Sequence, residues 1–344
     1  MDFESYKLEF TAKASLNGYS KENIDKCLKY AKPLLDKNLP IIYNTAHFCA
    51  LVGYKRRYLN RAMIYTSYFY RDFDIIKKNG KLRKISEPLP SLKEIQYWIL
   101  RNILEKVKIS AFAKAYKRKT TLKENVRFHS NQKILINFDI KDFFPSIQLE
   151  NIEEIFKNLG YSDWISNLMA KLCTRNKQLP QGAPTSPYLS NIFFKPIDDL
   201  IADYCIDKKI RYTRFADDLS FSGDFDEKDL SIFIKETLSA FQLNLNPDKT
   251  KILLRNQRQI VTGVVVNDKI QVPFYKRNKL RQTMFFINKF GVENHKEKLR
   301  IKNKNYISHL LGKVNFILNM NPNDNEFKNY KLQLLELRKK YPFY

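Results

Sequence analysis

The stretch IRYTRFADDLSFSG, residues 210–223, decides the fold class of this chain. Two short apolar strands flank the adjacent carboxylates Asp217 and Asp218, which predicts a β-hairpin that turns at the acidic pair. Along a regular strand these side chains would point to opposite faces, but a tight turn lets both face one cleft. Two like charges this close favour a bound cation, and Mg²⁺ is the obvious oxygen-ligated ion. An ordinary surface turn is the alternative, because Asp is common in turns.

A third carboxylate ends an earlier apolar strand. In KILINFDIKDFFPSI, residues 133–147, Asp139 closes the strand and Asp142 follows three residues later. A strand that ends in Asp at the same cleft would complete a site for two metal ions, one activating a 3′-hydroxyl and the other steadying a triphosphate. We expect Asp142 to cap the following turn or helix instead of binding metal.

These motifs resemble a known family. FADD at 215–218, Asp139 with Phe144 five residues later, and LPQGAPTSP at 179–187 together resemble the palm motifs of reverse transcriptases. LKEIQYWILRNIL at 92–104, VTG at 261–263 and NTAHF at 44–48 resemble the bacterial retron reverse transcriptases in particular. The likeness implies an α+β right-hand polymerase, with fingers, a palm whose antiparallel sheet packs on helices, and a helical thumb.

The resemblance also implies roles for residues at matching positions. Two Mg²⁺ ions would be held by three carboxylates and one backbone carbonyl, which are Asp139, Asp217, Asp218 and the carbonyl of Ile140. Lys249, in NPDKTKI, matches the lysine that protonates or neutralises the leaving pyrophosphate, with Lys251 as the alternative. Phe215 stands where the family usually has tyrosine, which removes a hydroxyl near the primer terminus but no metal ligand.

Further positions match the site for the incoming dNTP. Phe144 matches the aromatic steric gate that excludes a ribose 2′-hydroxyl. Gln181 and Gly182 match the loop over the nucleotide, where glycine permits a close backbone approach. Arg83, in GKLRKISEP, matches the finger residue that clamps the triphosphate, because a guanidinium engages two oxygens at once. Lys81 is a second candidate for that contact.

The charge of the chain agrees with a polyanionic partner. Its 344 residues include 61 Lys and Arg against 36 Asp and Glu, a net charge of +25. Such a surface attracts nucleic acid over roughly 8 Å at physiological salt. A compositional bias toward Lys, Asn and Ile is the alternative source of part of this excess. An apolar fraction of 44% allows a substantial core and argues against disorder.

Other features of the sequence bound the location of the protein. The four cysteines form no C-x-x-C pair, and we expect reduced thiols. His47 is expected to pack and not to bind metal. No run of about 18 uncharged apolar residues occurs, and the first ten residues do not resemble a secretion signal, so we expect a cytoplasmic protein without a membrane partner.

The chain is expected to divide into four parts. These are a helical extension at 1–60, fingers at 61–134, a palm at 135–272 of which about 150–180 belongs to the fingers, and a thumb at 273–344. The thumb is the most basic part, with 16 Lys and Arg against 5 Asp and Glu. Ser186 is expected to cap a long helix, and residues 260–273 to form a hairpin that turns at Asn267 and Asp268.

Retron enzymes bind a cognate structured noncoding RNA, copy it into branched multicopy single-stranded DNA, and act in antiphage defence, usually with a separate effector protein. The resemblance implies the same for this chain. The alternatives are another bacterial reverse transcriptase, of the abortive-infection or group II intron type, and a catalytically silent RNA-binding scaffold.

Overall fold

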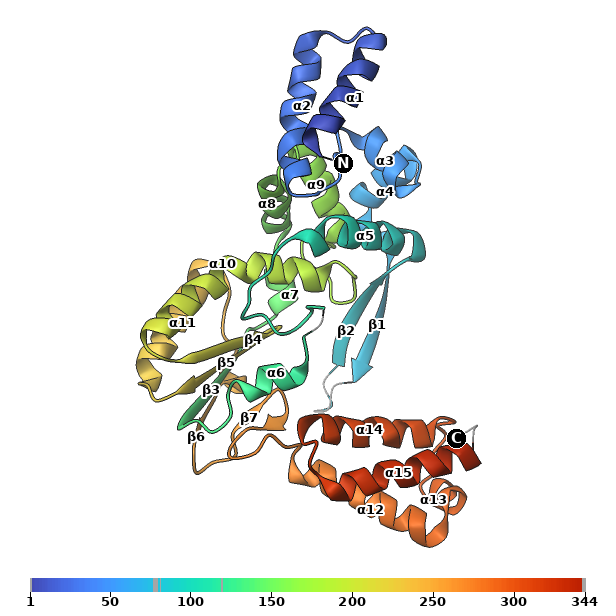
Figure 1. The fold of residues 1–344 in the computed structure, drawn as a ribbon, viewed down its shortest axis with the longest axis vertical. Helices are drawn as coiled ribbons and strands as arrows, with labels where there is room; N and C mark the ends of the chain where they lie inside the picture. The colour runs from blue at the N-terminus through green and yellow to red at the C-terminus, as the bar shows by residue number, and fades with distance from the viewer. Residues whose placement is uncertain (1, 77–79, 81, 119, 342–344) are drawn as a thin grey trace. The chain divides into compact units, whose positions relative to one another are not determined.

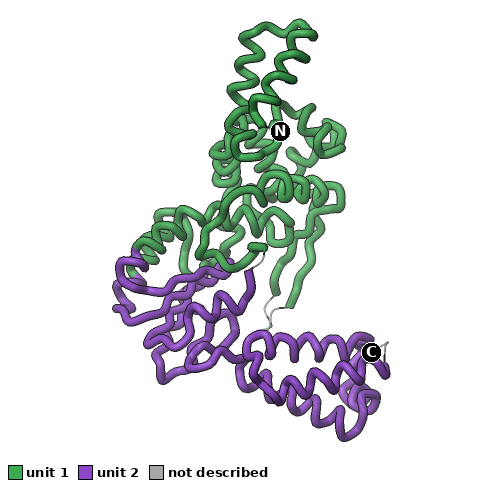
Figure 2. The backbone as a smooth tube through the Cα atoms, in the orientation of Figure 1, with its two compact units in different colours: residues 1–118, 140–203, 232–245 green, residues 119–139, 204–231, 246–344 purple. Residues whose placement is uncertain are grey.

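The computed structural model describes residues 2–76, 80, 82–118 and 120–341. The chain forms two compact units, which Figure 2 distinguishes by colour. Unit 1 comprises residues 1–118, 140–203 and 232–245, and unit 2 comprises residues 119–139, 204–231 and 246–344. The predicted α+β class is confirmed, because the described elements combine many helices with antiparallel sheets. The four predicted parts stay a prediction, and Lys81 lies outside the described residues.

Unit 1 is largely helical (Figure 1). The apolar face of its second helix is buried at Leu28, Ala31 and Leu34. Its helices are α1 (Phe3–Leu16), α2 (Lys21–Asp36), α3 (Thr45–Val52), α4 (Arg56–Ile64), α5 (Pro90–Asn102), α7 (Phe143–Ser146), α8 (Leu149–Leu159) and α9 (Asp163–Cys173), with 3₁₀ turns η1 (Thr66–Phe69) and η2 (Leu104–Lys106).

A two-stranded antiparallel hairpin, β1 (Tyr70–Ile76) and β2 (Leu82–Pro88), belongs to the same unit. Only the base of the hairpin is well buried, at Tyr70 and Pro88, while the outer strand residues are exposed. Arg83 lies on the exposed part of β2, paired with Ile75. The hairpin therefore depends on contacts at its base to fix its direction.

Two helices contribute residues to both units, α10 (Ser186–Asp207) and α11 (Glu227–Ala240). The predicted cap of α10 was wrong by one residue, because Ser186 already lies in the helix. The first backbone hydrogen bond of α10 runs from the Leu189 amide to the Thr185 carbonyl at 3.0 Å, which makes Thr185 the N-cap. Ser and Thr both suit this position, so composition alone does not separate them.

Unit 2 contains a four-stranded antiparallel sheet in the order β4-β5-β3-β6. Its strands are β3 (Ile134–Asp139), β4 (Arg211–Phe215), β5 (Asp218–Gly223) and β6 (Lys251–Leu254), and the 3₁₀ turn η3 (Pro247–Lys249) precedes β6. The short helix α6 (Leu122–Arg127) precedes β3. The sheet is the element that positions the acidic residues.

The segment 260–273 turns twice, and the sequence predicted only the second of these turns, at Asn267 and Asp268. Strands β7 (Ile260–Val261) and β8 (Val264–Val265) turn at Thr262 and Gly263, which have φ of +46° and +81°. Positive φ at both central residues matches the twist of a two-residue hairpin. A β-branched residue rarely adopts it, so the sequence did not suggest Thr262. Asn267 lies in the next loop, which the Val265–Gln271 bridge closes.

The C-terminal part of unit 2 is a bundle of four helices, α12 (Phe274–Phe290), α13 (Val292–Lys298), α14 (Tyr306–Met320) and α15 (Asn325–Lys340), seen in Figure 1. Its core continues into the β7–β8 hairpin, because Val261 and Val264 belong to the same buried cluster as Met284 and Leu310. Within the described ranges, every helix is too short or too polar to span a lipid bilayer.

Candidate active site

The acidic pair lies at the turn between β4 and β5. Phe215 pairs with Asp218, which leaves Ala216 and Asp217 as the two turn residues. Ala216 has φ of +61°, a conformation that costs a residue with a Cβ about 1 kcal/mol or more. Asp218 is the first residue of β5 and not part of the turn. The hairpin was predicted correctly, with the turn one residue earlier than the acidic pair.

The third carboxylate lies on the neighbouring strand. Asp139 ends β3 and pairs in register with Asp218. Directly opposed residues of an antiparallel pair have Cβ atoms about 5 Å apart, and like charges at that distance repel. Asp139 is only 6% exposed. The sheet therefore brings two carboxylates together in a place where water screens them poorly.

A lysine compensates one of these charges. Lys249, in η3, places Nζ 2.8 Å from both carboxylate oxygens of Asp139. The Asn246 amide also donates to the Asp139 carbonyl at 2.7 Å, so the 246–249 segment is fixed to the end of β3. Burial alone would lower the pKa of Lys249, but the bonds and charges of the carboxylates outweigh it and raise that pKa. Lys251 lies two residues on, paired with Asn137 on β3.

Ionisation of Asp218, which is paired with Asp139 across the sheet, is unfavourable. Burial, followed by the charges of Asp217 and Asp139, raises the pKa of Asp218 to about 7. Among the described residues no three His, Cys, Asp or Glu side chains form a ready-made metal cluster. The donor set nevertheless suits a divalent cation, because it consists of hard oxygens whose mutual repulsion a cation would relieve.

The carboxylates open onto a cleft of about 840 Å³ within unit 2. Its lining joins the acidic sheet edge to the β7–β8 turn through Asp139, Asp218, Lys249, Arg258, Thr262 and Gly263. Acidic and basic side chains that line one cleft suit a substrate that carries both phosphates and a bound cation.

The predicted nucleotide-binding residues belong to unit 1. Phe144 is partly buried, in α7, with its ring centroid 6.2 Å from that of Tyr116. Gln181 accepts a hydrogen bond from the Ser86 amide on β2 at 2.7 Å. The loop that carries Gln181 is thus bonded to the hairpin that carries Arg83. Ile140, the candidate carbonyl ligand, is buried and forms a bridge with Leu245.

Gly182 permits a close approach, but the neighbour in this structure is a strand. A Cβ at this position would lie 2.6 Å from the Ser86 carbonyl oxygen and 3.1 Å from Cγ2 of Ile85. The φ of Gly182 is +131°, which residues with a Cβ rarely adopt. The glycine therefore allows the 179–187 loop to contact β2.

Two further predictions concern single side chains. Asp142 is the N-cap residue of α7, as expected from its position, but its side chain makes no capping hydrogen bond. His47 lies with its ring stacked on Tyr43 at 6.0 Å, and burial lowers its pKa. This is the packing arrangement that we expected for His47.

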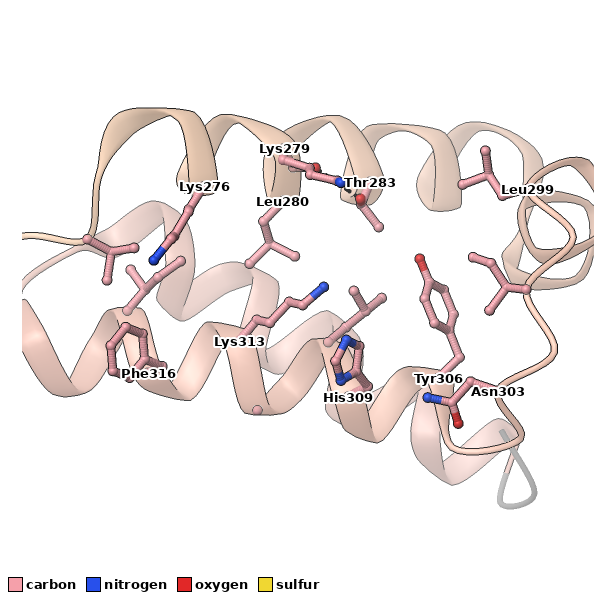
Figure 3. A pocket seen from close by; sticks show the side chains of 15 residues that line it. Lys276, Lys279, Leu280, Thr283, Leu299, Asn303, Tyr306, His309, Lys313 and Phe316 are labelled. Atoms are coloured by element: carbon pink, nitrogen blue, oxygen red, sulfur yellow. Dashed lines mark hydrogen bonds between the residues drawn. The ribbon is translucent and has the colours of Figure 1, made fainter. Parts of the chain in front are cut away.

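A second hollow of about 970 Å³ lies between α12 and α14. Figure 3 shows lysine side chains from both helices around it, together with His309 and Phe316. Lys276 and Lys279 come from α12 and Lys313 comes from α14. Cationic groups beside an exposed aromatic ring suit contacts with phosphates and bases.

Sequence reasoning missed a buried polar network behind the acidic sheet. His129 is fully buried and lies 2.8 Å from Oγ of Ser222 and 2.7 Å from Oγ1 of Thr213. Thr213 donates its hydroxyl proton to Oδ1 of Asn125 at 2.6 Å, so it accepts from Nε2 of His129. Burial lowers the pKa of His129 to about 3 and keeps it neutral. A histidine after a short helix gave no sign of this in the sequence.

Sequence reasoning also missed Arg175, which lies on the turn after α9 and binds Asp72 on β1. The two residues are 103 positions apart, and neither belongs to a recognisable motif.

Comparison with known proteins identifies the class. A family model described as reverse transcriptase (RNA-dependent DNA polymerase) matches residues 75–309. The chain therefore belongs to the reverse transcriptase family, and it is an RNA-directed DNA polymerase.

Within that family the chain is a bacterial retron reverse transcriptase, because the curated relatives that it matches are retron reverse transcriptases. It is 33% identical over 233 residues to the retron Ec86 reverse transcriptase of Escherichia coli, covering 66% of this chain and 73% of the relative. It is 28% identical over 232 residues to the retron Mx162 reverse transcriptase of Myxococcus xanthus, covering 59% of this chain and about half, 48%, of that relative.

Among solved structures, telomerase from Candida albicans in complex with a fragment of telomeric RNA is similar at a TM-score of 0.44 and 12% identity. The match covers 77% of this chain and 60% of that chain. The assignment rests on the family model and the retron relatives.

Proposed function

We propose that this chain copies a cognate structured noncoding RNA into branched multicopy single-stranded DNA in the cytoplasm, and that it acts in antiphage defence with a separate effector protein. The retron relatives support this proposal. The observation that carries its chemistry is the in-register pairing of Asp139 with Asp218, with Asp217 at the adjoining turn.

We propose that Asp139, Asp217, Asp218 and the carbonyl of Ile140 hold two Mg²⁺ ions. When bound, the ions would lower the pKa of the primer hydroxyl and offset the charge of the dNTP triphosphate. The raised pKa of Asp218 supports this, because carboxylates that repel one another gain most from a shared cation.

Lys249 is the proposed proton donor for the leaving pyrophosphate. Its side chain is 58% exposed although its ammonium contacts Asp139, so the stem is free to turn toward a bound triphosphate. The raised pKa keeps Lys249 protonated at neutral pH, as a general acid requires. The contact with Asp139 favours Lys249 over Lys251 for this role.

We assign dNTP binding to residues on three elements of unit 1. Arg83 on β2 would hold the triphosphate, and Lys81 stays a second candidate. Gln181 and Gly182 would line the nucleotide, and Phe144 would exclude a ribose 2′-hydroxyl. The hydrogen bond between Ser86 and Gln181 supports this grouping, because it joins the Arg83 hairpin to the loop.

The cognate RNA would bind the basic surface of the chain. The hollow between α12 and α14, with its three lysines, is one proposed contact for its phosphates (Figure 3). Phosphate contacts of this kind give affinity that falls steeply with salt.

Expression of the chain together with its flanking DNA tests the proposal. Small single-stranded DNA is extracted from cells with the wild type and with Asp217→Asn plus Asp218→Asn. A discrete, branched, RNase-sensitive product in the wild type alone is the expected result. Heterogeneous DNA without a branch would instead favour an abortive-infection or group II intron type of enzyme. No dNTP incorporation on any RNA template would favour the silent scaffold.

A further inference from the structure

The hairpin β1–β2 receives little support from packing. Phe73, Ile75 and Leu82 are 41%, 49% and 62% exposed, although all three are apolar. A two-stranded ribbon is marginally stable by itself. Something other than an apolar core must therefore fix the direction of the strand that carries Arg83.

The side chain of Arg175 binds both strands near the base of this hairpin. Nη2 of Arg175 lies 3.0 Å from Oδ2 of Asp72, and Nη1 contacts Oδ1 of the same carboxylate. Nη1 also donates to Oγ of Ser86 at 2.7 Å, and Ser86 donates to Asp72 at 2.8 Å. Asp72 and Ser86 are paired in register, so the guanidinium contacts both strands at one level. Two-pronged guanidinium–carboxylate pairs are among the strongest side-chain contacts.

Contacts within unit 1 also hold the Arg175 side chain in place. The Arg175 guanidinium carbon lies 5.4 Å from the centroid of the Tyr70 ring. The Tyr70 hydroxyl accepts a hydrogen bond from Gln96, which also donates to the Leu172 carbonyl at the end of α9. The side chain of Arg175 is 15% exposed, so its pair with Asp72 is poorly screened. The Arg175 guanidinium holds the pKa of Asp72 well below its usual range, and the pair stays charged at working pH.

Backbone hydrogen bonds join the turn at Arg175 to the segment after α7 and to the 179–187 loop. Arg175 and Gln178 exchange backbone hydrogen bonds of 2.8 and 3.0 Å across a tight turn. The next residue of the turn bonds back to the segment that follows α7, through the Leu179 amide and the Ile147 carbonyl at 3.1 Å. Leu179 and Pro180 lead directly to Gln181 and Gly182 in the same loop. The turn thus connects the Phe144 helix, the loop and, through Arg175, the hairpin.

We propose that Arg175 is a positioning residue for dNTP binding. By clamping Asp72 and Ser86 it holds the β1–β2 hairpin against the 179–182 loop, so that Arg83 and Gln181 meet the same incoming nucleotide. Arg175 touches no reacting atom in this account. The proposal rests on the proposed role of Arg83 in holding the triphosphate.

Steady-state incorporation of one dNTP on an RNA template with a DNA primer tests the clamp in the full chain. The variants are Arg175→Gln, Asp72→Asn and the double variant. Arg71→Gln is the matched control, because Arg71 lies one residue along the same strand and its side chain is 71% exposed. This control removes one positive charge and the Arg71–Glu87 pair from the hairpin, and it leaves Arg175, Asp72 and Ser86 unchanged.

Each single variant is expected to raise the KM for dNTP about tenfold, the scale of a lost charge-assisted pair. The kcat and the KM for template-primer should stay within about twofold of the wild type, because the carboxylates are untouched. The double variant should raise the KM for dNTP no more than Asp72→Asn alone, since both changes remove the Arg175–Asp72 contact and Asp72→Asn also removes the pair with Lys84. Arg71→Gln should behave as the wild type.

An unchanged KM for dNTP in Arg175→Gln overturns the clamp, as does an equal rise in Arg71→Gln or a multiplied effect in the double variant. If Arg175→Gln does not fold, Asp72→Asn decides the question, because Asp72 is a partly exposed strand residue. If the wild type incorporates no dNTP, the result contradicts the proposed polymerase function. An active wild type with an unaffected Arg175→Gln contradicts only the clamp.

Discussion

Replacement of Gly182 by alanine tests how the 179–187 loop contacts β2. The new Cβ would lie 2.6 Å from the Ser86 carbonyl oxygen, closer than real contacts allow. The backbone must also keep a φ of +131° with a side chain present. That strain costs roughly 1–3 kcal/mol. Loss of the 2.7 Å bond between the Ser86 amide and the Gln181 carbonyl adds about 1 kcal/mol.

We therefore expect Gly182→Ala to lower the free energy of unfolding by about 2–4 kcal/mol, measured by urea denaturation. Gly53→Ala separates strain from collision, because Gly53 has a φ of +76° with nothing within 4 Å of a Cβ. It should lose only about 1–2 kcal/mol. Gly312→Ala, on α14 with open space around it, should gain about 0.5–1 kcal/mol.

The KM for dNTP gives a second measurement on the same three variants. Gly182→Ala should raise it, because the strand that carries Arg83 has to move away from the loop. Gly53→Ala and Gly312→Ala should leave it unchanged. Equal losses of stability in Gly182→Ala and Gly53→Ala, with the same KM for dNTP, would refute the contact between loop and strand as the reason for the glycine.

Two further predictions concern unit 2. His129→Gln should destabilise the sheet at neutral pH by about 1–3 kcal/mol, because the hydroxyls of Ser222 and Thr213 lose their partner. In the wild type the pKa of His129 is lowered to about 3, so between pH 6.5 and 3 the unfolded chain binds a proton that the folded chain does not, and the stability falls as the pH drops through this range. The urea midpoint should fall less steeply with pH in the variant than in the wild type. Equal slopes would count against the buried network. Lys249→Met should lower the single-turnover rate constant of dNTP incorporation about a hundredfold, the scale of a lost general acid, while Lys251→Met should not. An equal loss in both variants would leave the choice of proton donor unsupported.

The three carboxylates proposed to hold metal could be picked out from the sequence because their patterns are local. FADD between two strands and Asp139 at a strand end each carry their own pattern, and antiparallel pairing was enough to bring them together.

Other features depend on the tertiary fold. The Arg175–Asp72 pair spans 103 residues, and the buried bonds of His129 to Ser222 and Thr213 span 93 and 84. Periodicity and turn chemistry say nothing about such separations. The turn at Thr262 was missed for a different reason, because the fold holds a β-branched residue in a conformation that its propensity opposes.

Single-turnover extension on an RNA template, measured as a function of Mg²⁺ concentration, tests whether Asp218 is required for metal-dependent DNA synthesis. The wild type is compared with Asp218→Asn and with Asp224→Asn, which removes an exposed carboxylate that pairs with Lys133 just beyond the same strand. We expect Mg²⁺-dependent extension by the wild type and by Asp224→Asn, with little or none by Asp218→Asn at any Mg²⁺ concentration. Wild-type rates in Asp218→Asn would contradict the assignment of this acidic hairpin as the catalytic site.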